Sequence, residues 1–170
     1  MLEVVETLTT AVQDVTYGVN ALLSAIPRKT GHAVPPAITA FLNDAEEGVL
    51  TRKRLPKDTT TPALVLFDVG VTWDVGVTQN LRRGTASVGL AYLRQDSADS
   101  ALMNRDSHYT LRALRRCLDH FDPSQTTLRT IALEELLAIE EGLLSLELGD
   151  VTFSSGMRVK YAIRDTAPLG

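Results

Sequence analysis

The stretch from Pro62 to Thr78 alternates between two kinds of side chain over most of its length. Its odd positions are all apolar: Val65, Phe67, Val69, Val71, Trp73, Val75 and Val77. Its even positions begin with Leu64 and Leu66 and then become polar or glycine. A period of two with many β-branched and aromatic residues predicts a strand that buries its odd face along its whole length. Because its start is apolar on both faces, we expect that part to be covered on both sides, with a bend or bulge at Gly70 or Gly76.

A second alternating stretch follows a polar turn at residues 79–84. Here Ala86, Val88, Leu90 and Tyr92 alternate with Ser87, Gly89 and Ala91. This pattern predicts a strand that pairs antiparallel with the first one. The small side chains on its other face leave room for a helix to approach. We also expect Phe67 and Trp73 of the first strand to pack against a helix.

Two stretches carry apolar residues at helical spacing. In the first, these residues are three and four apart: Val5, Leu8, Val12, Val15, Val19, Leu22 and Ile26. We expect one helix, stopped by Pro27 and lying across one sheet face, although a coiled-coil dimerisation seam fits the same spacing. The second helix is expected to begin at a cap, Asp106 or Ser107, and to end at Pro123. Its buried stripe is Leu111, Leu114, Leu118 and Phe121.

Residues 27–61 form a long connection rich in proline and charge. We expect a short helix around residues 36–45, with Ile38, Phe41 and Leu42 directed inward. A connection of this length is usually functional or mobile. Its basic cluster is either a solvated loop or a contact with an acidic partner or with phosphate. The cluster consists of Arg52, Lys53, Arg54 and Lys57.

Alternation returns in the last third of the chain. Residues 126–139 fit a strand or a helix, and we favour a strand that begins near Leu128. Short alternating runs follow, and the last predicted strand, residues 157–163, is apolar on one side and carries Arg158 and Lys160 on the other. Together these elements predict a single α+β domain over residues 1–170: a mainly antiparallel twisted sheet with an N-terminal helix and a second helix packed on it.

The composition excludes several classes of function. A chain of 170 residues with a net charge of −4 and a pI of about 5.4 has no strong field that would favour nucleic acid or anionic lipid. Its single cysteine, Cys117, excludes an internal disulfide. We find neither a signal-peptide pattern nor a long apolar run, so we expect the chain to fold in a cytoplasm and not to enter a membrane.

The sequence contains little that points to catalysis. It lacks a glycine-rich phosphate loop, a His-x-x-x-His or Cys-x-x-Cys pair and a Gly-x-Ser-x-Gly motif. Cys117 and His120 lie one helical turn apart and fit half of a metal site or a Cys–His pair. Cys117 also belongs to the apolar stripe, which favours a core position. We therefore predict no catalytic residue, no metal, no cofactor and no enzyme activity.

Opposite charges gather in different parts of the sequence. The acidic block over residues 134–147 contains Glu134, Glu135, Glu140, Glu141 and Glu147 and no lysine or arginine. The basic residues are Arg52, Lys53, Arg54, Arg82, Arg83, Arg158 and Lys160. They indicate separate positive and negative surfaces. These are either merely solvated or form a heterologous interface in which successive subunits close a ring.

The order of the elements resembles the tail terminator (tail completion) family of long-tailed bacteriophages. The resemblance covers nearly the whole chain and depends on five segments. These are the helix ending at Ile26, the strand Pro62-Ala63-Leu64-Val65-Leu66, its partner Ser87-Val88-Gly89-Leu90-Ala91-Tyr92-Leu93, the helix from Leu111 to Phe121, and the closing Gly-Met-Arg-Val-Lys-Tyr-Ala-Ile. The long 27–61 segment departs from the family, which leaves a related neck or head-completion protein as the alternative.

The resemblance implies a structural virion protein of the tail or neck, assembled in the host cytoplasm. Such a subunit forms a ring, typically a hexamer, which caps the tail tube, stops its polymerisation and joins the tail to the head connector. Its partners would be further copies of itself, the tail tube protein, the head–tail connector protein and DNA that passes through without specific binding. The basic residues named above would then lie at subunit or partner interfaces, and Glu134, Glu135, Glu140 and Glu141 at the lumen or rim. In a different class, the chain is a ligand-binding module or small enzyme with residues 27–61 as a lid.

Overall fold

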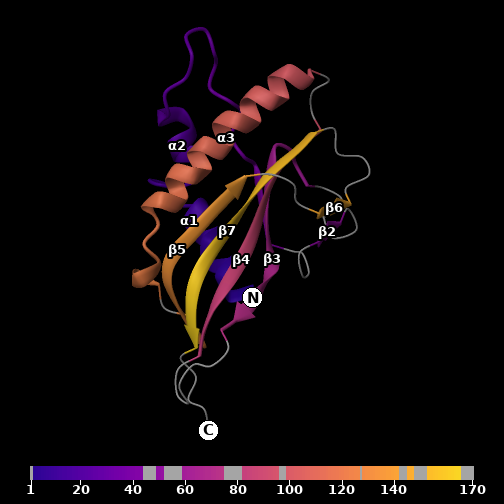
Figure 1. Cartoon of the computed structure of the whole chain (residues 1–170). Coiled ribbons are helices and arrows are strands. Elements are labelled where there is room, and N and C mark those ends of the chain that lie inside the picture. Colours follow the sequence, from indigo (N-terminus) through magenta and orange to yellow (C-terminus); the bar gives the residue numbers. More distant parts are fainter. Residues whose placement is uncertain are drawn as a thin grey trace.

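The structure, a computed structural model, describes residues 2–43, 49–51, 59–74, 82–95, 99–126, 128–141, 145–147 and 153–165. Figure 1 shows how its elements are arranged. The helices are α1 (Leu2–Val12), α2 (Val19–Ala25), α3 (Ser100–His120) and the short 3-10 helix η2 (Pro123–Gln125). The strands are β1 (Ala40–Leu42), β2 (Val49–Thr51), β3 (Ala63–Trp73), β4 (Arg83–Arg94), β5 (Ile131–Glu141), β6 (Ser145–Glu147) and β7 (Phe153–Asp165).

Five strands form one mixed sheet in the order β1-β3-β4-β7-β5. Strand β1 pairs parallel with β3, and the other three pairings are antiparallel. Strands β2 and β6 form a separate parallel pair, which Figure 1 draws on the other side of the main sheet from α3. The predicted α+β class, a mainly antiparallel sheet with helices packed on it, is confirmed. None of the described helices is long and apolar enough to span a membrane.

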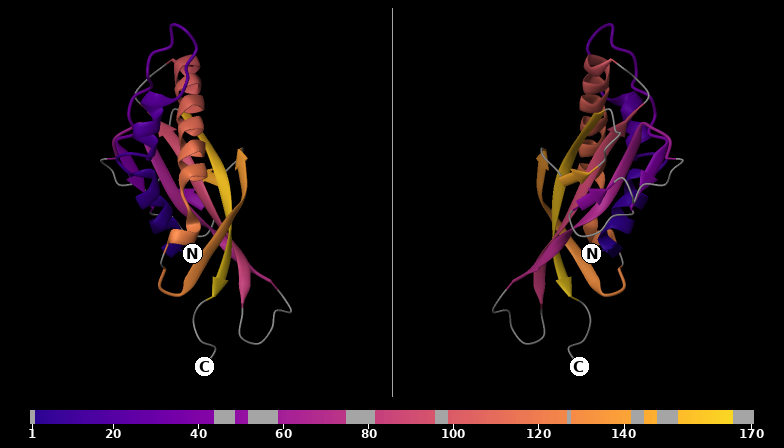
Figure 2. Two further views of the ribbon diagram at one scale, coloured as in Figure 1. Left: turned by 90° about the vertical axis from the view of Figure 1, so that its left-hand side faces the viewer. Right: turned by 90° about the vertical axis from the view of Figure 1, so that its right-hand side faces the viewer.

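The main core lies between the helices and one side of the sheet, which we call the helix face (Figure 2). Its strand residues are Leu64, Leu66, Ala86, Val88, Leu90, Tyr92, Ile131, Leu133, Met157, Val159, Tyr161 and Ile163. The buried faces predicted for the second strand and for the last strand are therefore confirmed. We call the opposite side of the sheet the outer face.

Strand β3 changes the face that its odd residues bury. Phe67 lies in a second apolar cluster on the outer face, whereas Trp73 packs against the core on the helix face. The pairing register shifts between Asp68 and Gly70, and Gly70 has a φ of 134°. The extra residue of this bulge exchanges the faces of all side chains that follow it. The bulge predicted at Gly70 is confirmed, as is the burial of Ala63–Phe67 on both faces. The prediction of one continuous buried odd face is wrong.

Gly89 in β4 provides space for the ring of Phe67. A Cβ atom at this position would lie 2.4 Å from Cζ of Phe67, closer than two carbon atoms can pack. The small residues of β4 therefore admit an aromatic side chain from the neighbouring strand. The predictions that a helix fills this space and that Phe67 packs against a helix are wrong.

The N-terminal apolar stripe belongs to two helices, not to one. A turn over residues 13–18 separates α1 from α2 and leaves Val15 92% exposed. The Asp14 carboxylate accepts hydrogen bonds from the backbone N–H groups of Thr16 and Tyr17, which favours the turn over further helix. A Cβ at Gly18 would lie 2.2 Å from the carbonyl oxygen of Asp14, so only glycine permits this close approach. The α1 residues of the stripe pack on the sheet as predicted, whereas Ile26 at the end of α2 packs against Tyr109 and Ala113 of α3. The helical segment ends before Pro27, as predicted.

Helix α3 begins earlier than predicted. Its cap is Asp99, whose side chain accepts a hydrogen bond from the N–H of Leu102 at 3.1 Å. Asp106 and Ser107, the two predicted caps, are both buried residues in the middle of the helix. Asp106 pairs with Arg94 of β4 at 2.7 Å. The first turns of the helix look polar in the sequence because their inward side includes this charge. Leu111, Leu114 and Leu118 of the predicted stripe are buried, and Arg112 and Arg115 on the other side of the helix are exposed.

The helix predicted around residues 36–45 is wrong, because part of this segment is strand β1. Ala40–Leu42 pairs with Ala63–Val65 at the start of β3. Those β3 residues are fully buried, so their backbone groups need hydrogen-bond partners, which an added strand supplies. Phe41 packs against the main core and Leu42 against the outer-face cluster, as alternation in a strand requires.

The region that fitted either a helix or a strand is strand. β5 begins at Ile131, a few residues after the predicted start, and pairs antiparallel with β7. Its register shifts twice, between Leu133 and Glu135 and between Leu136 and Ala138. These bulges disturb the period of two, which explains why the sequence pattern was ambiguous.

Candidate functional site

The predicted acidic block and the basic side of the last strand lie next to each other on the sheet. Nζ of Lys160 is 3.0 Å from Oε1 of Glu140, and Nε of Arg164 is 3.2 Å from Oε1 of Glu134. Because β5 pairs directly with β7, segments twenty to thirty residues apart in sequence become neighbours. The prediction that these charges form separate surfaces is wrong. Such half-exposed pairs contribute about 0–1 kcal/mol each.

The other candidate charges on these strands differ in their partners. Glu141 lies 3.1 Å from Arg115 of α3. Glu135 is exposed and makes no ion pair within the described ranges. Arg158 is partly buried between Glu140 on β5 and Gly89 on β4, and its Nε has no hydrogen-bond partner among the described residues. Most of the acidic block is therefore neutralised inside the subunit, and its place at a lumen or rim stays a prediction.

The end of the β3–β4 hairpin presents two exposed arginines, Arg82 and Arg83. The guanidinium of Arg82 lies 4.4 Å from the ring centre of Trp73, within range of a cation–π contact. The backbone here is held by two hydrogen bonds of 2.8 Å, from Asp74 N–H to the carbonyl of Arg83 and from Asp165 N–H to the carbonyl of Arg82. We call Trp73, Arg82 and Arg83 the arginine end. Their exposure agrees with the predicted interface, whose partner stays a prediction.

The predicted basic cluster, Arg52, Lys53, Arg54 and Lys57, lies outside the described residues. The described part of the same connection is held against the helices. Asn20 of α2 makes two hydrogen bonds to the backbone of Ile38, at 2.8 and 2.9 Å. The Tyr109 hydroxyl of α3 accepts a hydrogen bond from the N–H of Lys29 and lies 2.7 Å from Nδ1 of His32. These contacts argue against residues 27–43 acting as a lid.

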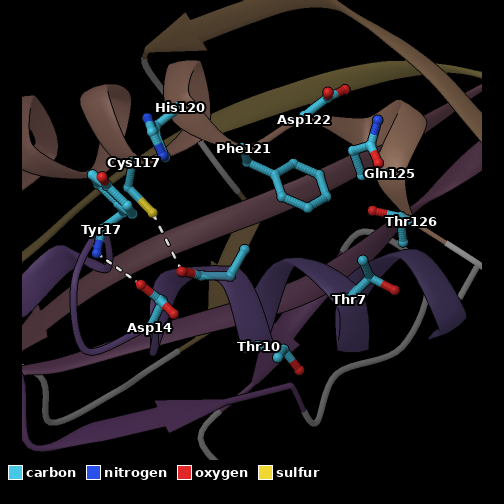
Figure 3. Close-up of a pocket in the computed structure, with 11 residues that line it drawn as sticks. Thr7, Thr10, Asp14, Tyr17, Cys117, His120, Phe121, Asp122, Gln125 and Thr126 are labelled. Atoms are coloured by element: carbon cyan, nitrogen blue, oxygen red, sulfur yellow. Dashed lines mark hydrogen bonds between the residues drawn. The ribbon is translucent and has the colours of Figure 1, made fainter.

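A pocket of about 580 Å³ opens where the ends of α1 and α3 meet η2 (Figure 3). Tyr17 and His120 stack at one side of it, with ring centres 3.7 Å apart. Asp14 and Asp122 are two of its polar residues. Backbone hydrogen bonds from Tyr17 and Thr16 lower the pKa of Asp14, and hydrogen bonds from Ser124 lower that of Asp122. The pocket thus combines aromatic surface with two carboxylates that are ionised at neutral pH.

Cys117 lines this pocket but is not set up as a nucleophile. Its thiol lies 3.6 Å from the carbonyl oxygen of Ala11, to which it donates a weak hydrogen bond. Burial raises the pKa of the thiol to about 11, and the negative charge of Asp14 adds to this shift. Cys117 and His120 are not joined by a third ligand, since the described residues contain no cluster of three that could hold a metal ion.

Iodoacetamide should modify Cys117 far more slowly in the native protein than in urea at pH 8, because the thiolate is the reacting form. The folded pKa of about 11 lies above the ordinary 9.0. The thiol's contribution to stability is therefore fully present below pH 9 and is lost as the pH rises toward 11. Mass spectrometry of timed samples measures both rates. Equal rates in the native and unfolded protein would contradict the buried thiol.

The sequence alone did not identify this pocket. Its residues come from α1, the turn after it, the end of α3 and η2, which are distant in sequence. The signal that was available is the presence of Asp14 and Gly18 within the first apolar stripe, because both are typical turn residues.

No protein-family model matches the chain, and no curated protein matches its sequence.

Proposed function

We propose that this chain is a structural subunit of a bacteriophage tail, a terminator that forms a ring on the tail tube. The ring stops polymerisation of the tube and offers a second surface to the head connector. The order of the elements supports this proposal, since it resembles the tail terminator family over most of the chain. That family implies an α+β sheet with an N-terminal helix and a second helix on it, which is the fold of this chain.

The observation that carries the proposal is that one subunit exposes two unlike surfaces. The arginine end lies where β3 ends and β4 begins, and an apolar, acidic pocket lies between the helices. A heterologous contact requires two different patches, and such contacts build rings when the rotation closes. A terminator acts by matching the end of the tube on one face while presenting another surface on its other face. It needs no reactive side chain, in keeping with the protonated thiol of Cys117.

Removing this protein from an otherwise complete tail assembly should give overlong tails or tails that are not joined to heads. The reason is that tube growth by identical rings does not stop by itself. Tail length and head attachment are measured by electron microscopy. Overlong tails identify a terminator, whereas unjoined tails of normal length identify a neck or head-completion protein. Normal tails on normal heads would reject both.

A ligand-binding module is the candidate from a different class, and the size of the pocket between the helices favours it. Native mass spectrometry of the purified chain separates the two classes. A closed ring supports the virion protein, and a monomer that carries a small molecule supports the binding module.

A further inference from the structure

The pocket between the helices lies next to two further hollows. It shares Thr7 and Thr10 with a hollow of about 520 Å³ on one side. It shares Tyr17 and His120 with another hollow of about 430 Å³ on the other side. The three hollows are therefore neighbours, arranged along α1 and around the end of α3. We call them together the α1 groove.

The α1 groove has an acidic lining, and its surface is mainly apolar in the central pocket and in the hollow beside Leu22. Leu2 and Tyr17, two of the most exposed large apolar residues among those described, border it, at 54% and 49% exposure. Five carboxylates line it, against two arginines: Glu3, Glu6, Asp14, Asp119 and Asp122. The central pocket has no lysine or arginine in its lining. Such a groove fits a segment with cationic heads and apolar bodies.

The arginine end of the same chain has these properties. Arg82 and Arg83 are exposed and form no ion pair with a carboxylate within the described ranges. Asp74 and Asp165 are acidic residues beside this end. The guanidinium groups and the Trp73 ring, more than net charge, therefore distinguish it. Arginine and tryptophan are the residues most often found at energetically dominant positions of interfaces. Stacking on Trp73 also orders the Arg82 side chain before any contact forms.

We propose that the α1 groove of one subunit receives the arginine end of a second copy of this chain. The carboxylates of the groove would accept hydrogen bonds from the guanidinium groups, and the apolar surface would cover the arginine stems and the indole. The two patches belong to different parts of the subunit, so each subunit gives one contact and receives another. The proposal rests on the proposed ring and names the surfaces that would form it.

A disulfide cross-link tests the contact directly. Tagged Thr10→Cys subunits are mixed with untagged Arg83→Cys subunits under mild oxidation, and cross-linked dimers are separated by mass. Dimers that join the two variants should exceed those in a matched mixture with Arg112→Cys, an exposed α3 arginine outside both surfaces. Cys117 should not compete, because it is buried and protonated. A yield no higher than that of the Arg112→Cys mixture would overturn the proposal.

Assembly gives a second readout. Thr10 is exposed on α1, so Thr10→Arg should obstruct the groove with a cation while leaving the subunit folded, and Thr10→Ala is its matched control. We expect Thr10→Arg and the double variant Arg82→Glu with Arg83→Glu to raise the concentration for half-assembly about tenfold, as raised salt should. Thr10→Ala should assemble normally.

The outcomes separate this contact from the proposed function. A ring that forms equally well with Thr10→Arg would overturn the contact and leave the terminator proposal standing. Subunits that stay monomeric at all concentrations would also overturn the contact. The tail-length experiment uses no groove variant and decides the function independently.

Discussion

Asp106→Ala should lower the free energy of unfolding by about 3–5 kcal/mol. Asp106 is 2% exposed, and its Oδ2 accepts a hydrogen bond of 2.7 Å from the Arg94 guanidinium, itself 5% exposed. The variant removes a carboxylate that lies at hydrogen-bond distance from a cation in the core of the protein. Less of the desolvation cost of that cation is then offset by attraction. The pair also joins the first half of α3 to β4, so its loss should loosen that contact.

Urea titration of Asp106→Ala measures this loss, and two variants serve as controls. Asp119→Ala removes an exposed carboxylate from the same helix and should change stability by no more than about 0.5 kcal/mol. Arg94→Met with Asp106→Leu removes both charges and should lose much less than Asp106→Ala. If Asp106→Ala unfolds at the same urea concentration as Asp119→Ala, the pair is not buried in solution.

The sequence predicted best where the backbone is regular. β4 pairs with β7 over twelve consecutive positions without a register shift, and the faces predicted for both strands are correct. β3 and β5 contain bulges, each of which reverses or blurs the alternation. A bulge was expected at Gly70, but the same odd face was still predicted to be buried before and after it. A bulge moves the side chains that follow it to the opposite face of the sheet. The error at Phe67 and the uncertainty over residues 126–139 have this same origin.

Other errors come from interactions between distant parts of the chain. The start of α3 looked like a loop because Asp106 is polar. Its partner, Arg94, lies on strand β4, so the sequence around the helix does not show that Asp106 is buried. Part of the segment expected to be a helix around residues 36–45 forms strand β1 instead. Pairing with the edge of β3 outweighs the local preference of these residues for a helix. The charges of β5 and β7 were assigned to separate surfaces because the order of charges along the sequence does not show which strands pair. The exposure of Arg82 and Arg83 agrees with the polar turn expected at residues 79–84, because polar residues of a turn are seldom covered.

Phe67→Ala should cost about 3–5 kcal/mol through lost transfer free energy and the cavity that remains. The ring is fully buried on the outer face and lies over Gly89, which has no side chain to fill the space. Phe67→Leu fills more of the site and should cost less, about 1.5 kcal/mol or below. Thermal melts give these values, and a wild-type melting temperature for Phe67→Ala would mean that the ring is not buried.

Gly89→Ala supplies the sharper test of this packing, because the sign of its effect should depend on residue 67. In the wild-type chain the new Cβ would lie 2.4 Å from the Phe67 ring, so the variant should be destabilised. In the Phe67→Ala background the same methyl group would partly fill the cavity and should recover stability. The double-mutant cycle then gives a favourable coupling between the two alanines, of the size seen for residues in direct contact. Additive effects would show that ring and glycine do not touch.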